Sequence, residues 1–176
     1  MEDPTAGTYK QLTLSNWQDP DPISQKFALR SPIVGMRPME GNDWARQILA
    51  VDLGPQVPED VRDVFGVARG CLVYGWFFYP LFRLGQEQLY RLGEMAARDR
   101  VEQIDGKRPK DFARAIKRLV ELGEIDERDK DDWHLLRKAR NRSSHPAYAT
   151  MMPPGVVLAT LKGVAHRINR LFVPGR

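Results

Sequence analysis

Apolar residues recur at helical spacing from Pro58 to Phe172, and this pattern restricts the chain to a mainly helical fold. The last segment is the clearest, because after Pro153 and Pro154 its apolar residues share one helix face: Val157, Leu158, Leu161, Val164, Ile168, Leu171 and Phe172. Four earlier helices are predicted in the same way: one that opens at Pro58, a long one that includes Leu81 to Ala96, and two over about 111–122 and 126–144. About five helices with short connections predict an all-α fold, an antiparallel bundle.

The long helix carries a polar residue inside its apolar stripe. One side of this helix holds the apolar residues Leu81, Leu84, Leu92, Met95 and Ala96. Gln88 lies in the middle of the stripe, and a buried glutamine must find a hydrogen-bond partner. We expect that partner on a neighbouring helix.

The first third of the chain lacks a long helical pattern. Residues 1–58 contain seven of the thirteen prolines. Alternation over Tyr9–Ser15 predicts a short strand. A short helix is predicted over Asn42–Leu49, with Asn42 or Asp43 as its cap.

Three aromatic residues in this region, Trp17, Phe27 and Trp44, are too apolar for a free tail. We therefore expect residues 1–57 to form an extended arm that wraps the core or lies across a partner subunit. Residues 58–176 would then form the helical domain.

The bulk properties are those of a soluble protein with one domain. A chain of 176 residues can build one core, and no stretch approaches the roughly 20 apolar residues of a membrane helix. The N-terminus lacks the pattern of a signal peptide. A single cysteine, Cys71, excludes an internal disulfide and fits a small core residue. We expect a cytoplasmic protein that does not contact membranes.

The net charge of +4 conceals an asymmetry between two parts of the chain. Residues 1–132 hold 19 Lys and Arg against 23 Asp and Glu, whereas residues 133–176 hold eight Lys and Arg and no acidic residue. A surface that meets a polyanion would have such an acid-free segment. The alternative is that the two parts neutralise each other within one fold.

The hexapeptide Arg140-Asn141-Arg142-Ser143-Ser144-His145 lies in this positive segment, directly before Pro146. Arginine can bind a phosphate with its planar fork of donors, and histidine can transfer protons near neutral pH. Metal-free phosphodiester chemistry on RNA needs this pair of residue types. The sequence thus offers a candidate site for RNA cleavage.

The position of Arg140 around its helix and the presence of Pro146 both affect the geometry of the hexapeptide. Arg140 falls at the edge of an apolar arc, between Trp133 and Leu136, so it either extends outward to solvent or faces a specific anion or carboxylate. Pro146 disfavours α conformation at His145 and should end the helix near residue 144. In a continuous helix the two side chains would point about 140° apart, and a break lets them converge.

The remaining polar residues have less specific interpretations. Asn141 can cap backbone groups or orient a phosphate, and for Ser143 and Ser144 we favour capping. His134 shares a helix face with Asn141 and either extends a phosphate-contact surface or is simply exposed, whereas His166 should be a surface residue. No His, Asp or Glu cluster has metal-ligand spacing, so we expect neither a metal nor another cofactor.

The hexapeptide resembles the Arg-Asn-x3-His signature of the HEPN superfamily, a group of small helical proteins. The order of features from Val57 to about Phe172 is also similar to HEPN domains of unassigned function. The features that carry this likeness are Val57–Arg62 at a helix start, Arg83 and Glu87 one turn apart before Leu89, a helix with Ala115, Ile116 and Leu119 that ends in Glu121–Ile125, the hexapeptide helix and a final apolar helix.

The resemblance implies an HEPN-like bundle with an irregular N-terminal arm, acting as a metal-independent endoribonuclease. Many HEPN proteins are ribonuclease toxins or RNA-cutting parts of antiviral defence systems. Arg140, Asn141 and His145 would be the catalytic residues, and Arg137, Arg142 and His134 would bind RNA. An antitoxin or another protein of a defence system would be a partner.

The resemblance also implies a homodimer, because HEPN nucleases pair two domains so that both motifs line one cleft. A second interpretation stays open, in which the chain is a catalytically silent HEPN domain that binds RNA or acts as a scaffold subunit. The intact Arg140, Asn141 and His145 favour the nuclease.

Overall fold

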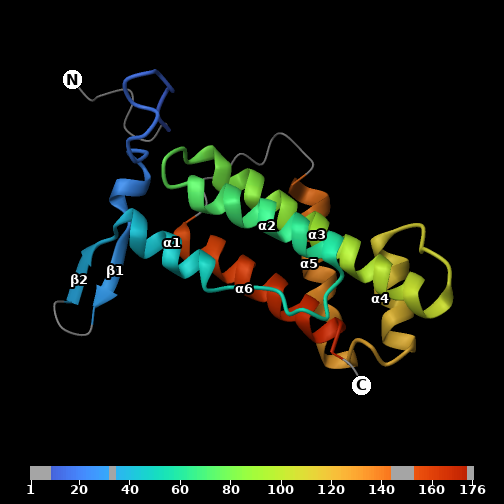
Figure 1. Cartoon of the computed structure of the whole chain (residues 1–176). Coiled ribbons are helices and arrows are strands. Elements are labelled where there is room, and N and C mark those ends of the chain that lie inside the picture. The colour runs from blue at the N-terminus through green and yellow to red at the C-terminus, as the bar shows by residue number, and fades with distance from the viewer. Residues whose placement is uncertain (1–8, 32–34, 144–152, 174–176) are drawn as a thin grey trace.

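The computed structural model describes residues 9–31, 35–143 and 153–173, and it confirms the all-α prediction. In chain order the elements are η1 (Ser24–Lys26), β1 (Ala28–Ser31), β2 (Gly35–Pro38), α1 (Gly41–Leu49), α2 (Glu59–Tyr74), α3 (Pro80–Asp105), α4 (Phe112–Glu121), η2 (Glu127–Asp129), α5 (Lys130–Ser143) and α6 (Pro154–Leu171). Helices α2 to α6 form the bundle. The short hairpin β1–β2 projects at one end of it, beside α1 (Figure 1). Among the described residues, no helix combines the length and apolar character needed to cross a membrane.

Helix α3 is the centre of the bundle, because it packs against α2, α4, α5 and α6. Its buried face differs from the predicted apolar stripe. Leu84 is 45% exposed, and the buried positions are Phe82, Gly85, Gln86, Leu89, Leu92, Gly93, Ala96, Ala97 and Val101. The buried glutamine is therefore Gln86 and not Gln88, and its Nε2 donates to Oγ1 of Thr160 on α6 at 3.4 Å. Large apolar residues lie on more than one side of α3, since Phe82 and Leu89 are buried whereas Leu84 is exposed. The buried glycines add no apolar signal, so the predicted stripe was shifted.

Gly93 sets the distance between α3 and α5. A Cβ atom at this position would lie 2.4 Å from Cδ2 of Leu136, which is buried on α5. No side chain can occupy that space unless Leu136 moves. The glycine thus brings the C-terminal half of α5 close to α3.

Gly93→Ala is therefore expected to destabilise the protein by about 1–3 kcal/mol through overpacking against Leu136. Gly66→Ala is the matched control, since Gly66 is an exposed position within α2 and a Cβ there would meet no atom within 4 Å. It should stabilise by roughly 0.5–1 kcal/mol, because alanine loses less entropy in a helix. Urea unfolding of both variants measures the difference, and a Gly93→Ala protein as stable as the wild type would contradict the close contact.

The helix boundaries follow local signals that the sequence displays. Pro80 occupies the first turn of α3, and the side chain of Asp111 caps α4 by accepting from the backbone N–H of Arg114 at 2.8 Å. Gly123 follows α4 with φ +74°, the left-handed conformation in which many helices end. The predicted segment 126–144 is divided into the short turn η2 and α5.

Two predictions for the N-terminal region were wrong in detail. Residues 9–15 form no strand and contain a turn, and the observed strands are β1 and β2, which pair antiparallel with Leu29 opposite Arg37. The short helix exists as α1, but its cap is Glu40, which forms a reciprocal capping box with Asp43. Arg37 donates two hydrogen bonds to the Asp43 carboxylate, at 2.7 and 2.9 Å, and holds the pKa of that carboxyl down to about 2.

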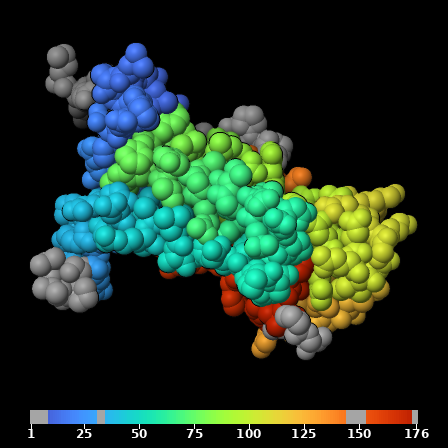
Figure 2. Space-filling view, viewed as in Figure 1, coloured from blue at the N-terminus to red at the C-terminus, as the bar shows by residue number. Residues whose placement is uncertain are grey.

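The N-terminal region packs onto α2 and α3 and supplies part of the core (Figure 2). Phe27 contacts the rings of Trp44, Trp76, Tyr79 and Phe82, with centroid distances of 6.1–6.4 Å. The fully buried Asp21 accepts from the backbone N–H of Tyr79, immediately before α3, at 3.0 Å. These contacts hold the region against the end of the bundle where α3 begins.

Candidate functional site

Arg140 lies near the C-terminal end of α5 and forms an ion pair with α3. Its neighbours in the helical arc, Trp133 and Leu136, are buried, whereas the adjacent Leu135 is 60% exposed. The Arg140 Nε lies 2.8 Å from Oε2 of Glu94. Arg140 therefore faces a specific carboxylate, which was one of the two predicted alternatives.

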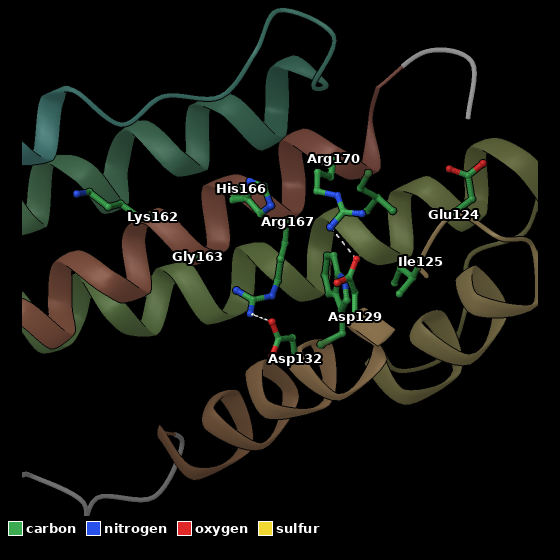
Figure 3. A pocket seen from close by; sticks show the side chains of 11 residues that line it. Glu124, Ile125, Asp129, Asp132, Lys162, Gly163, His166, Arg167 and Arg170 are labelled. Carbon is green, nitrogen blue, oxygen red and sulfur yellow. Dashed lines mark hydrogen bonds and ion pairs between the residues drawn. The ribbon is translucent and has the colours of Figure 1, made fainter. Parts of the chain in front are cut away.

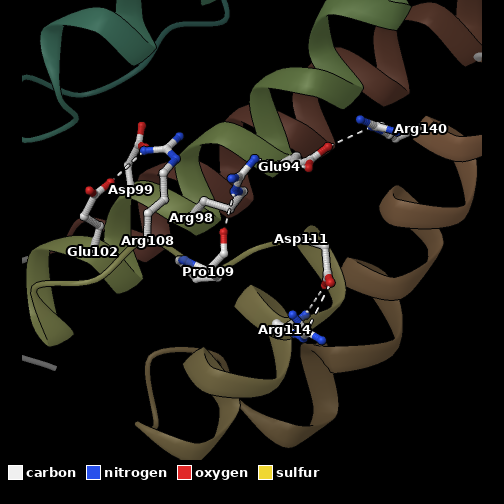
Figure 4. Close-up of polar contacts among 9 residues, drawn as sticks. All are labelled: Glu94, Arg98, Asp99, Glu102, Arg108, Pro109, Asp111, Arg114 and Arg140. Carbon is white, nitrogen blue, oxygen red and sulfur yellow. Dashed lines mark hydrogen bonds and ion pairs between the residues drawn. The ribbon is translucent and has the colours of Figure 1, made fainter.

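Glu94 is a site residue that the sequence analysis missed. Its side chain is only 15% exposed, and its second oxygen, Oε1, lies 3.7 Å from Nη1 of Arg98 one turn later on α3. Arg98 in turn donates from Nε to the carbonyl oxygen of Pro109 at 3.1 Å. Glu94 thus joins two arginines from two helices, and Figure 4 shows its carboxylate directed at Arg140. A phosphate that displaced this carboxylate would meet both guanidinium groups.

The structure describes only some of the remaining residues of the hexapeptide. Asn141 is exposed at the end of α5, and the hydroxyl of Ser143 donates to the carbonyl oxygen of Arg140 at 2.9 Å. This bond is the capping role that we expected for Ser143. Ser144, His145 and Pro146 lie outside the described residues, so the predicted convergence of Arg140 and His145 stays a prediction.

The three predicted RNA-binding residues lie on two faces of α5. Arg137 is half-buried and lies one turn after His134 on the same face. His134 is half-buried and borders a hollow between α5 and α4. Arg142 is exposed and points about 160° away from Arg140 around the helix. Arg137 and His134 can therefore extend one surface, whereas Arg142 belongs to another.

Several arginines of the acid-free segment pair with carboxylates from earlier in the chain. Arg167 lies 2.6 Å from Asp132, and Arg170 lies 2.8 Å from Asp126 and 2.7 Å from Asp129. These pairs, like that of Arg140 with Glu94, neutralise positive charge within the fold, as one of the two interpretations expected. The pairs hold α6 against α5 and η2.

Arg167, Arg170, Asp129 and Asp132 border a pocket of about 340 Å³ between α5 and α6 (Figure 3). Basic and acidic side chains line it together and form ion pairs, so its charges are largely balanced internally. His166 stands at its border and is exposed, as predicted. This internal pairing leaves the pocket without the excess positive charge that an RNA backbone requires.

A smaller hollow of about 210 Å³ adjoins this pocket further along α5, where α3, α5 and α6 meet. Tyr90, one turn before Glu94 on α3, lines it together with Thr160 of α6. Burial raises the pKa of the Tyr90 hydroxyl, and the hydrogen bond to Thr160 opposes this shift. Tyr90 therefore stays protonated at neutral pH and can act there as a hydrogen-bond donor.

Comparison with known families adds one finding. Residues 89–173 match the family model described as "Domain of unknown function (DUF4145)". The match begins in the middle of α3 and includes Glu94, Arg140 and the whole hexapeptide. Comparisons with curated proteins and with solved structures gave no match.

Proposed function

We propose that this protein is a metal-independent endoribonuclease of the HEPN type that acts as a toxin or as an effector of antiviral defence. The observation that carries the proposal is the position of Arg140, half-buried at the end of α5 and oriented by the carboxylate of Glu94. An arginine directed in this way by a second group is suited to a phosphate that must be held in one geometry. The sequence Arg140-Asn141-x3-His145 supplies the rest of the chemistry.

In the proposed reaction the ribose 2′-hydroxyl attacks the adjacent phosphorus. His145 takes the proton of that hydroxyl, the new O–P bond closes a 2′,3′-cyclic phosphate, and the 5′-oxygen leaves with a proton from an acid. Arg140 stabilises the negative charge that develops on the phosphate oxygens, and Asn141 orients the phosphate or His145. The products are a 2′,3′-cyclic phosphate and a 5′-hydroxyl, and no oxidant or metal takes part.

We further propose a homodimer in which two copies of the motif line one cleft, because one His145 cannot be base and acid at the same moment. The second subunit would supply the acid. In a toxin, a partner protein such as an antitoxin would cover this cleft.

A second function has an observation in its favour. The ion pair between Arg140 and Glu94 connects α5 to α3, so Arg140 can serve the fold alone. In that case the chain would be a catalytically silent HEPN domain that binds RNA or acts as a scaffold subunit. Binding of RNA without cleavage, unchanged by His145→Ala, would assign this function.

Incubation of the purified protein with mixed cellular RNA and EDTA distinguishes the two functions. The nuclease is expected to cleave RNA equally well with and without the chelator, because its chemistry uses side chains only. Gel analysis over time measures the cleavage. Activity that disappears in EDTA and returns with a divalent cation would reject the proposed mechanism.

A further inference from the structure

A hollow of about 480 Å³ between α4 and α5 is distinct from the Arg140–Glu94 site. Residues of both helices border it: Ala113, Lys117, Val120, Glu121, Lys130 and His134. Ala113 and Val120 provide an apolar surface, whereas Lys117 of α4 and Lys130 of α5 bring positive charge beside one carboxylate, that of Glu121. An apolar surface beside cations suits a nucleobase and its flanking phosphates.

The side of α5 that borders this hollow carries basic and neutral polar residues. Lys130, His134, Arg137 and Asn141 follow one another at intervals of four, three and four residues, so they form a single stripe on the helix. The stripe contains no acidic residue, and it ends beside Arg140. From His134 to Arg140 the distance along the helix axis is about 9 Å, at ~1.5 Å per residue. A strand bound along the stripe would therefore reach the candidate cleavage site.

The existing ion pairs of the two lysines are weak enough to be replaced. Lys117 lies 3.8 Å from Glu121, and the two side chains are 79% and 47% exposed. Lys130 pairs with Glu127, which is 71% exposed. Exposed pairs of this kind contribute little to stability. A polyanion can compete for both lysines.

Two buried nitrogen atoms on the stripe lack partners within the described part of the chain. They are Nδ1 of His134 and Nε of Arg137. Buried polar atoms are normally hydrogen-bonded, because the loss of water must be compensated. His134 borders the hollow and Arg137 lies about one turn further along the stripe, so both atoms are placed to bond a polar ligand such as an RNA strand.

We propose that the hollow between α4 and α5 is a subsite for one unpaired nucleotide of the RNA substrate. Its base packs on Ala113 and Val120 beside His134, and its phosphates contact Lys117, Lys130 and Arg137. The strand then follows the α5 stripe to Arg140. This inference rests on the proposed function, since it assigns a binding track to the same substrate.

The test measures RNA binding separately from cleavage. In a full-length His145→Ala background, the double variant Lys117→Glu/Lys130→Glu is compared with Lys26→Glu/Lys162→Glu, which makes the same change in net charge at exposed positions away from the hollow. Fluorescence anisotropy with a short labelled single-stranded RNA gives the Kd at several salt concentrations. The first variant should raise the Kd about tenfold or more and lower the slope of log Kd against log salt by about 1.4, at roughly 0.7 per lost phosphate contact. The second should leave both quantities close to the background.

Three results would overturn the subsite. Equal weakening of RNA binding by both double variants would show a general charge effect. Stronger competition by poly-glutamate than by RNA of equal charge would assign the hollow to an acidic protein. Unchanged KM for RNA when Lys117→Glu/Lys130→Glu is placed in the active protein would reject the subsite and leave the nuclease intact. Absence of cleavage by the wild-type protein would instead reject the proposed function.

Discussion

Arg140→Ala is expected to reduce RNA cleavage by about 10²–10³-fold, the usual loss when a preorganised charge-stabilising donor is removed. His145→Ala should cost at least as much, because it removes the proton transfer as well. Both variants should remain folded. Loss of the ion pair between Arg140 and Glu94 should lower the free energy of unfolding by at most about 1 kcal/mol. The Arg140 side chain is 38% exposed, and Glu94 keeps Arg98 as a partner.

Arg46→Ala is the control for this prediction. Arg46 is an exposed arginine on α1, so the variant loses the same charge away from the candidate site. Initial rates on one RNA substrate, together with circular dichroism and a solution mass for each variant, separate catalysis from folding and assembly. If Arg140→Ala cleaved RNA as fast as Arg46→Ala, the ion pair with Glu94 would be the whole role of Arg140.

Trp44→Ala is expected to lower the free energy of unfolding by about 3–5 kcal/mol, although Trp44 lies outside the predicted helical domain. Its side chain is 1% exposed, and the centroid of its ring lies 5.1 Å from the ring centroid of Phe82 on α3. The indole Nε1 donates to the carbonyl oxygen of Leu72 on α2 at 2.8 Å. The substitution leaves a cavity and an acceptor without its donor between α1, α2 and α3.

The matched control is Trp17→Ala, because Trp17 is 57% exposed in the same N-terminal region. Its loss should change stability by no more than about 0.5 kcal/mol. Urea unfolding followed by far-ultraviolet circular dichroism measures both variants. Equal midpoints for Trp44→Ala and Trp17→Ala would mean that α1 is not part of the same cooperative core.

Several helices of the bundle could be predicted because they have clear signals at their ends. Pro80 and Pro154 stand in first turns, Asp111 caps α4, and Gly123 follows it. The buried face of α3 could not be predicted in the same way. Large apolar residues lie on both the buried and the exposed sides of this helix, as Phe82 and Leu84 do, and the buried Gly85 and Gly93 add no apolar signal.

The N-terminal region was harder for a different reason. Residues 9–15 alternate in polarity, but an isolated alternating segment forms a strand only if another strand pairs with it. The pair that does form, β1 with β2, is four residues long on each side and thus too short to stand out. Burial of Phe27 and Trp44 followed from their apolar character, whereas their position against Phe82 depends on tertiary packing.

For the candidate site, helical phase placed Arg140 between buried neighbours but could not identify Glu94. Glu94 and Arg98 are spaced like an ordinary pair on a helix surface, and nothing local relates them to residue 140. Their meeting with Arg140 depends on how α3 and α5 align, which Gly93 and Leu136 determine. The hollow between α4 and α5 has the same origin, since its lysines belong to different helices.

RNA cleavage by 2′-hydroxyl attack can be recognised from the ends of the products. A defined RNA should be cleaved by the wild-type protein in EDTA and the fragments analysed by mass spectrometry, beside a copy with 2′-deoxyribose at the cleaved position. We expect 2′,3′-cyclic phosphate and 5′-hydroxyl ends, and an uncut deoxy-substituted RNA. Fragments with 5′-phosphate ends, or cleavage of the deoxy-substituted RNA, would rule out attack by the 2′-hydroxyl.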